Sequence, residues 1–237
     1  MGSIYLIRHG QASFGTENYD VLSPLGYRQS VFLGDYLAQL GIQFDRCISG
    51  AMDRQQDTAH ATLQRISDLG NLRQPPIEID LAFNEFEAEA VIQAHLPELL
   101  QIEPEALHIF RNAADHRREF QRLFRYVIQR WVSGHHEKQG LESWQVFVDR
   151  VWLGLERLLS QAGKKDRVAI FTSGGAITAL LQRVLELPPI KAFEMNWQIV
   201  NTSLSQLKFR DHEIALASFN SHAHLELLKN PELITFR

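Results

Sequence analysis

The amino-acid sequence predicts an α/β fold of three layers, in which a mainly parallel sheet carries helices on both faces. Short apolar runs alternate with helical patterns at the start of the chain, and the same alternation resumes near its end. Between them, at about residues 87–161, only helical patterns occur. We therefore expect a single domain over residues 1–237 with an inserted helical cap.

Each expected element has a local signal. A short apolar run predicts a buried strand at residues 4–7, and further strands are expected at residues 44–48 and 167–172. Apolar residues at helical spacing predict helices at residues 24–40, 52–66 and 177–187. Ser23 followed by Pro24 is typical of a helix N-terminus, because serine caps the first N–H groups and proline needs none. Two further strands, at about 200–209 and 214–218, flank a polar hairpin turn at 210–213.

Composition and charge argue against several classes of protein function. The formal net charge of -4 argues against a dedicated nucleic-acid or anionic-membrane binder, since such proteins normally carry a basic excess. No apolar run approaches the ~20 residues of a membrane helix, and we expect no signal peptide. Cys47, the single cysteine, is expected to be a buried thiol. These features favour a cytoplasmic protein.

Polar residues come directly after three of the expected strands. They are Arg8-His9-Gly10, the segment 49–54 with Arg54, and Ser173-Gly174-Gly175. Because open α/β sheets bind ligands at the carboxyl ends of their strands, we expect these segments to form one site. A histidine there can act as a nucleophile towards phosphorus, and arginines beside it can hold phosphate oxygens through bidentate bonds. A satisfied histidine next to a structural arginine is the alternative interpretation of the short Arg-His-Gly string.

The sequence resembles the histidine phosphatase superfamily, in its phosphoglycerate mutase-like branch. The resemblance covers almost the whole chain and is most specific in the first sixty residues. Its motifs are Arg8-His9-Gly10, Asp20, Leu22-Ser23, Gly26, Gln29, Ser49, Arg54, Thr58-Ala59 and Asn84-Glu85.

This resemblance implies a metal-independent phosphohydrolase that acts on a phosphate monoester through a phosphohistidine intermediate. His9 is then the nucleophile and Glu85 the proton donor, while the phosphate is bound by Arg8, Arg54, Ser173 and the backbone of Gly174. A role for Glu85 in capping a helix or pairing with an arginine is the alternative. No cofactor is implied, and we assign no metal site, because the adjacent histidines at 135–136 lack ligand spacing.

One position departs from the family pattern. Ser173 stands where the family has a second histidine, and a hydroxyl cannot carry an imidazolium charge. His222 is a candidate replacement, with a surface or core role as its alternative, and we interpret His224 as structural. The departure keeps open a second hypothesis, a phospholigand-binding or regulatory protein with weak or no turnover. A phosphoglycerate mutase is less favoured, because residues 11–15 do not resemble the mutase segment.

The expected partners are a phosphorylated small molecule or a phosphoprotein, and inorganic phosphate. Neither nucleic acid nor a membrane is expected, and the sequence determines neither the substrate nor the oligomeric state. A series of arginines lies within the expected cap, at positions 117, 118, 122, 125 and 130. We interpret it as the solvated face of an amphipathic helix, with a cationic surface that attracts phosphorylated substrate as the alternative.

Overall fold

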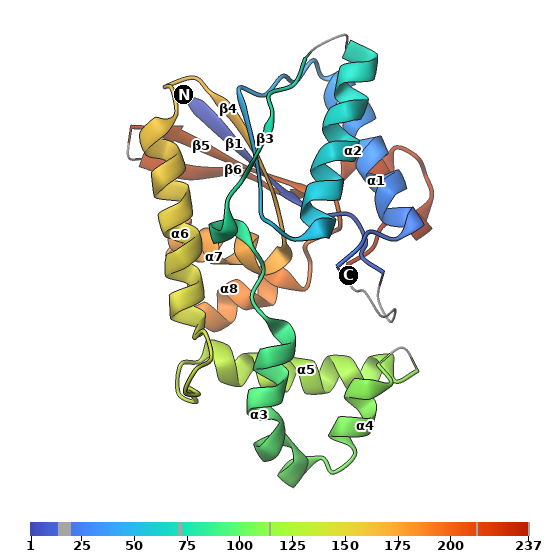
Figure 1. Ribbon diagram of the computed structural model, residues 1–237, viewed down its shortest axis with the longest axis vertical. Coiled ribbons are helices and arrows are strands. Elements are labelled where there is room, and N and C mark those ends of the chain that lie inside the picture. Colours follow the sequence, from blue (N-terminus) through green and yellow to red (C-terminus); the bar gives the residue numbers. More distant parts are fainter. Residues whose placement is uncertain (14–19, 71–72, 114, 212, 237) are drawn as a thin grey trace.

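The computed structural model describes residues 1–13, 20–70, 73–113, 115–211 and 213–236, and in this part of the chain six strands form one sheet. The strands are β1 (Gly2–Arg8), β2 (Arg46–Ser49), β3 (Ile77–Ile79), β4 (Arg167–Thr172), β5 (Leu204–Arg210) and β6 (Glu213–Ser221). Their order is β3-β2-β4-β1-β5-β6, and the first four are parallel. Strand β5 runs antiparallel to its neighbours β1 and β6 (Figure 1). The predicted α/β fold with a mainly parallel sheet is confirmed.

Helices cover both faces of this sheet. Helices α1 (Pro24–Gln39) and α2 (Asp53–Gly70) lie on one face, and α6 (Trp144–Gln161) and α7 (Gly174–Val184) on the other. Strand β1 shows why both faces are apolar: Ile4 and Leu6 belong to the core under α6 and α7, whereas Ile7 packs under α1 and α2. Cys47 is buried in this second core, and burial raises the pKa of its thiol to about 12.

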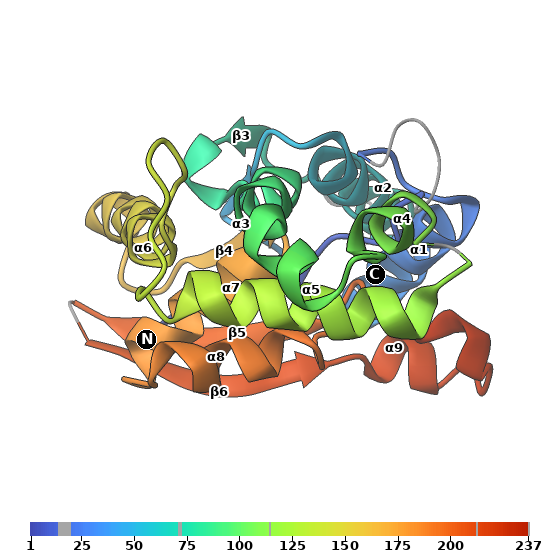
Figure 2. The same cartoon turned by 90° about the horizontal axis from the view of Figure 1, so that it is seen from below.

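The helical region between β3 and β4 has two parts. Helices α3 (Ala88–Ile102), α4 (Ala106–Arg111) and α5 (Arg117–Val132) lie beyond the carboxyl ends of the strands, whereas α6 runs alongside the sheet (Figures 1 and 2). Aromatic rings join the parts, because Phe86 packs on Trp131 of α5 at 4.6 Å and on Phe147 of α6 at 5.6 Å between ring centroids. The single domain with a cap at about 87–161 remains a prediction.

Several boundaries differ from those expected. The strand expected from residue 200 begins at Leu204, because the backbone turns at Thr202, whose φ is 59°. Strand β3, which has three residues, and helix α8 (Pro189–Asn196) were not expected, and neither offers a long periodic pattern. Short helices also occur at Leu81–Phe83, Ala223–Glu226 (α9) and Pro231–Leu233. Phe14, Gly15 and His212, which belong to segments interpreted above, lie outside the described residues.

None of the helices described is both long enough and apolar enough to cross a membrane.

The loop after β1 crosses α1 at two glycines. A Cβ at Gly10 would lie 2.5 Å from the carbonyl oxygen of Gly26, and a Cβ at Gly26 would overlap the carbonyl oxygen of Gln11. Both contacts are with backbone, which cannot move aside as a flexible side chain can. The close approach therefore fixes how the residues after β1 lie on α1.

We predict that Gly26→Ala destabilises the protein, although the same change inside a helix ordinarily stabilises it by up to about 1 kcal/mol. The added methyl group must displace the Gln11 backbone, and such overpacking costs about 1–3 kcal/mol. Urea unfolding measures the effect, with Gln39→Ala on the exposed end of the same helix as control, for which we expect a change within about 0.5 kcal/mol. A more stable Gly26→Ala variant would contradict the close contact.

Candidate active site

The register of the sheet brings the predicted segments together. Arg8 at the end of β1 pairs with Thr172 of β4, and Ser49 at the end of β2 pairs with Phe171. The residues after these three strands therefore leave the same edge of the sheet side by side. That edge faces helices α3 to α5 (Figure 1).

His9 is buried, with 3% of its surface exposed, and its ring is held in one orientation. Nδ1–H donates to the carbonyl oxygen of Gly10 at 2.7 Å, which leaves the lone pair on Nε2. The Nε atom of Arg54 lies 3.2 Å from Nε2 and donates to it. Burial, together with the charges of Arg54 and Arg8, holds the pKa of His9 well below its usual value. The ring is therefore uncharged at neutral pH and keeps a lone pair that can attack phosphorus.

The backbone of His9 is anchored from the turn before β5. Thr202 N–H donates to the carbonyl oxygens of Arg8 and His9, and the Asn201 side chain donates to the His9 carbonyl oxygen at 3.0 Å. Behind this turn, His224 is buried and its Nε2 lies 2.9 Å from the Thr202 hydroxyl. That hydroxyl donates to the Asn201 carbonyl, so Nε2 of His224 must be the donor to it. His224 thus supports the turn that fixes His9.

Arg54 stands at the start of α2, and only 6% of its side chain is exposed. Besides its bond to His9, its Nη1 forms an ion pair with Asp20 at 2.5 Å, and its Nη2 contacts the sulfur atom of Met52 at 3.2 Å. Thr58, one turn along α2, accepts from the Gly10 N–H and donates to the Arg54 carbonyl. Helix α2 therefore fixes both the arginine and the loop that bears the histidine.

Arg8 brings a second guanidinium group to this edge. Its Nη1 donates to the carbonyl oxygen of Ile199, and its Nη2 donates to that of Phe236 at 3.0 Å. A Cβ at Gly174 would lie 3.8 Å from the central guanidinium carbon of Arg8. The guanidinium therefore lies beside the N-terminus of α7, where backbone N–H groups and the helix dipole also favour an anion.

Glu85 contacts the N-terminus of α7 as well. One carboxylate oxygen accepts from the Gly175 N–H at 2.9 Å and the other from the Phe86 N–H at 3.2 Å. Glycine is required at 175, because a Cβ there would overlap the carboxylate. Burial raises the pKa of Glu85 above its ordinary value, although the Gly175 bond and both arginines act in the opposite direction. A carboxyl group of raised pKa is suited to donate a proton.

Ser173 lies directly before α7 and is fully buried. Its hydroxyl accepts a hydrogen bond of 2.8 Å from the Gln55 side chain, which also donates to the Phe83 carbonyl oxygen. The other polar side-chain atom of Gln55, its Oε1, is buried and has no hydrogen-bond partner among the described residues. A glutamine amide, which carries no charge, therefore lies against Ser173, the residue at which the sequence was expected to depart from the family pattern.

His222 lies at the same sheet edge but is engaged elsewhere. Its Nδ1 is 2.8 Å from the Asn220 carbonyl oxygen, and its Nε2 lies 3.4 Å from the Glu226 carboxylate. The register pairs Ser221 with Leu204, and Leu204 with Ile7, so two strand spacings of about 4.8 Å each separate it from β1. The structure does not bring His222 into contact with His9.

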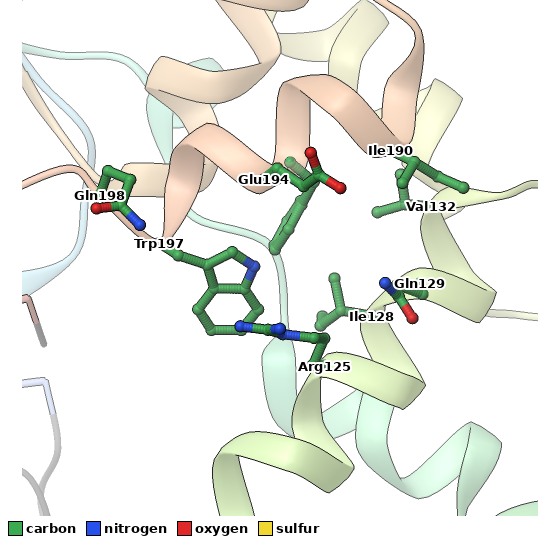
Figure 3. Close-up of a pocket in the computed structure, with 9 residues that line it drawn as sticks. Arg125, Ile128, Gln129, Val132, Ile190, Glu194, Trp197 and Gln198 are labelled. Atoms are coloured by element: carbon green, nitrogen blue, oxygen red, sulfur yellow. The ribbon is translucent and has the colours of Figure 1, made fainter.

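Three arginines of the cap series contact neighbouring residues. Arg122 forms an ion pair with Glu103 at 2.6 Å, Arg130 lies 3.1 Å from His136, and Arg125 lies over the ring of Trp197 at 5.8 Å. Figure 3 shows this last contact beside a cavity of about 250 Å³ between α5 and α8. Trp197 comes two residues before Ile199, whose carbonyl holds Arg8. The cavity therefore adjoins the site without containing His9.

Gln55, Asn201 and Thr202 were not among the sequence-predicted site residues. Gln55 comes directly after Arg54 and has no distinguishing pattern of its own. Asn201, Thr202 and Ser203 stand between the apolar pair Ile199-Val200 and β5, and all three are buried. Three consecutive polar residues in an expected strand are therefore the signal that could have located the turn.

Comparisons with known proteins concern the family and the fold of the chain. A sequence model described as "Histidine phosphatase superfamily (branch 1)" matches residues 4–222. A search of the curated protein sequences found no significant match. Similar solved structures include a phosphoglycerate mutase from Bacillus anthracis, with 17% identity, a TM-score of 0.63 and coverage of 97% of each chain.

Two further structures carry the same fold. One is a phosphoserine phosphatase mutant from Entamoeba histolytica in complex with phosphoserine, with 18% identity, a TM-score of 0.63 and coverage of 95% of this chain and 100% of that chain. The other is a putative alpha-ribazole-5'-P phosphatase from Escherichia coli, with 21% identity, a TM-score of 0.65 and coverage of 93% of this chain and 97% of that chain. At these identities the likeness concerns the fold.

The buried His224 predicts a dependence of stability on pH. Burial lowers its pKa to about 3, whereas the unfolded chain has the ordinary value of 6.5. As the pH falls below 6.5, the unfolded state takes up a proton and the folded state does not, so the free energy of unfolding decreases. One pKa unit corresponds to about 1.4 kcal/mol, so up to about 2–3 kcal/mol is lost between pH 6.5 and pH 4.5. Above pH 6.5 this contribution is constant.

Urea unfolding at several pH values tests this expectation. We expect the unfolding free energy of His224→Gln to fall less steeply between pH 6.5 and pH 4.5 than that of the wild type. His60→Gln, which replaces an exposed histidine, is the control and should retain the wild-type slope. Equal slopes for His224→Gln and the wild type would show that His224 is not the group responsible.

Proposed function

Because the chain belongs to the histidine phosphatase superfamily, we propose that it is a metal-independent phosphohydrolase that acts on a phosphate monoester through a phosphohistidine on His9. One observation carries the proposal: the His9 ring is fixed by Gly10, uncharged, and presents Nε2 towards the Arg54 guanidinium. A lone pair held beside a cation is what a nucleophile towards an anionic phosphoryl group requires.

The first step forms the intermediate. The phosphoryl oxygens bind Arg8, Arg54 and the N-terminus of α7, and the Arg54 Nε–H turns from Nε2 of His9 to one of these oxygens. The freed Nε2 then attacks phosphorus while the bond to the leaving oxygen breaks. Glu85 gives its proton to that oxygen, which leaves as an alcohol. The raised pKa of Glu85 supports this role, since it keeps a larger fraction of the carboxyl protonated before the step.

The second step releases phosphate. The Glu85 carboxylate takes a proton from a water molecule, whose oxygen attacks the phosphorus. The P–N bond breaks and the electron pair returns to Nε2, so His9 and protonated Glu85 are both restored. Because the Nδ1–H bond to Gly10 is present in the free enzyme, the same ring nitrogen is available for every cycle.

The anion site defines the substrate class only in part. Arginines recognise a phosphate group whatever carries it, so a phosphorylated small molecule and a phosphoprotein both satisfy the site. Structures with this fold include proteins in complex with phosphoserine and with 3-phosphoglyceric acid, and both compounds are small phosphate monoesters. We propose a phosphorylated small molecule as the first class to assay.

The alternative is a phospholigand-binding or regulatory protein with weak or no turnover. Ser173 is the observation that favours it, because a buried hydroxyl bonded to Gln55 supplies no positive charge to the transferring phosphoryl group. Loss of one donor to a developing oxyanion typically costs roughly 10²- to 10³-fold in rate. We therefore propose an active enzyme whose turnover is slow.

We predict that the chain hydrolyses a generic aryl phosphate in the presence of a chelator and that His9→Ala reduces kcat by on the order of 10⁴-fold or more. When the aryl phosphate carries a labelled phosphoryl group and the reaction is quenched rapidly without acid, the label should be found bound to the wild-type protein. His9→Ala should carry no label. His60→Ala, at an exposed histidine of α2, is the matched control and should behave as the wild type. A stable complex with phosphate but no turnover would instead support the binding-protein alternative.

A second prediction concerns Ser173. Ser173→His restores a cationic donor and should raise kcat by up to roughly 10²-fold. The new ring must fit beside Gln55, so the double variant Ser173→His with Gln55→Ser should show the larger gain. Activity that falls in both variants, together with loss of activity in His222→Ala, would show that His222 already supplies the charge.

A further inference from the structure

Asp20 binds Arg54, which is one of the groups of the proposed phosphate site, and the backbone at the start of α2. Its Oδ1 pairs with Arg54 Nη1 at 2.5 Å, and its Oδ2 accepts from the Asp53 backbone N–H at 3.0 Å. Asp53 is the first residue of α2, a helix of 18 residues whose N-terminal dipole favours negative charge. A carboxylate bridging a guanidinium group and a helix N-terminus resembles the way phosphate oxygens are bound in proteins.

The two partners of this ion pair differ in their freedom to move. The Arg54 side chain is 6% exposed, and its Nε donates to His9. The Asp20 side chain is 34% exposed, so its carboxylate can turn towards water once another anion satisfies the charge of Arg54. When a phosphoryl group reaches Nε2 of His9, the Arg54 Nε–H turns from Nε2 to a phosphoryl oxygen. Of the two partners in the ion pair, the more exposed carboxylate is then the one that yields.

The acceptors described above for the two arginines of the site differ in charge. Arg8 donates to the carbonyl oxygens of Ile199 and Phe236, which are neutral. Asp20 carries a full negative charge, so it repels a phosphate dianion as well as competing with it for Nη1. Asp20 therefore opposes phosphate binding more strongly than these two carbonyl groups do.

We propose that Asp20 is a positioning residue that exchanges with the phosphate on Arg54: it moves aside for the phosphoryl group and expels inorganic phosphate by returning to Nη1. The inference rests on the proposed function and extends it to product release. The exchange makes and breaks no covalent bond. An alternative role, in which Asp20 only orients Arg54 for phosphate, predicts the opposite effect of removing its charge.

Asp20→Asn separates these roles, because the amide keeps the shape and a neutral acceptor for Arg54 but removes the charge. Calorimetric titration with inorganic phosphate at fixed pH and salt should give a dissociation constant roughly three- to tenfold lower than that of the wild type. Product inhibition by phosphate should tighten by a similar factor, without an increase in kcat. Asp53→Asn, which removes a carboxylate from the same helix end, is the matched control and should change the constant by no more than about twofold.

Two results would overturn the inference while leaving the proposed function standing. One is phosphate binding that Asp20→Asn leaves unchanged or weakens, which would assign Asp20 an orienting role. The other is a gain that persists in an Arg54→Gln background, since the exchange requires the Arg54 guanidinium. Absence of phosphate binding to both the wild type and Asp20→Asn would instead overturn the proposed function, and this inference with it.

Discussion

Two guanidinium groups lie next to an uncharged imidazole at the carboxyl edge of the sheet, and the rest of the site is arranged around them. Removing an arginine from water is costly unless its charge and donors are satisfied. Asp20 pairs with Arg54, and two backbone carbonyls accept from Arg8. The cations in turn help to keep His9 neutral, so the proposed anion site and the proposed nucleophile depend on the same arrangement.

This arrangement depends on a fixed backbone around His9, and several buried polar side chains bind that backbone. The turn at Asn201 and Thr202 binds the carbonyls of the nucleophile segment, and buried Gln29 of α1 donates to the Leu233 carbonyl while accepting from the Gln11 N–H. These side chains come from distant parts of the chain and converge behind the site. Their bonds leave the His9 ring a single orientation without placing a further charge beside it.

The sheet, its flanking helices and the three polar strand ends could be predicted, because strand and helix periodicities are local and the residues after each parallel strand gather at one carboxyl edge. Asn201, Thr202 and Gln55 could not be assigned, since their roles depend on contacts across the fold. The serine at 173 was visible in the sequence, whereas its contact with Gln55 was not. Likewise, the helical pattern of residues 87–161 did not reveal that α6 flanks the sheet while α3 to α5 lie beyond its edge.

The bond between Arg8 and the Phe236 carbonyl has a practical meaning for anyone who prepares the protein. It ties the last described part of the chain to Arg8 of the proposed phosphate site, whereas Met1 lies at the opposite end of β1 (Figure 1). A purification tag fused after this segment would extend from the protein next to Arg8 and hinder the entry of a ligand. A tag fused before Met1 would leave from the far edge of the sheet, where it can be retained during ligand measurements.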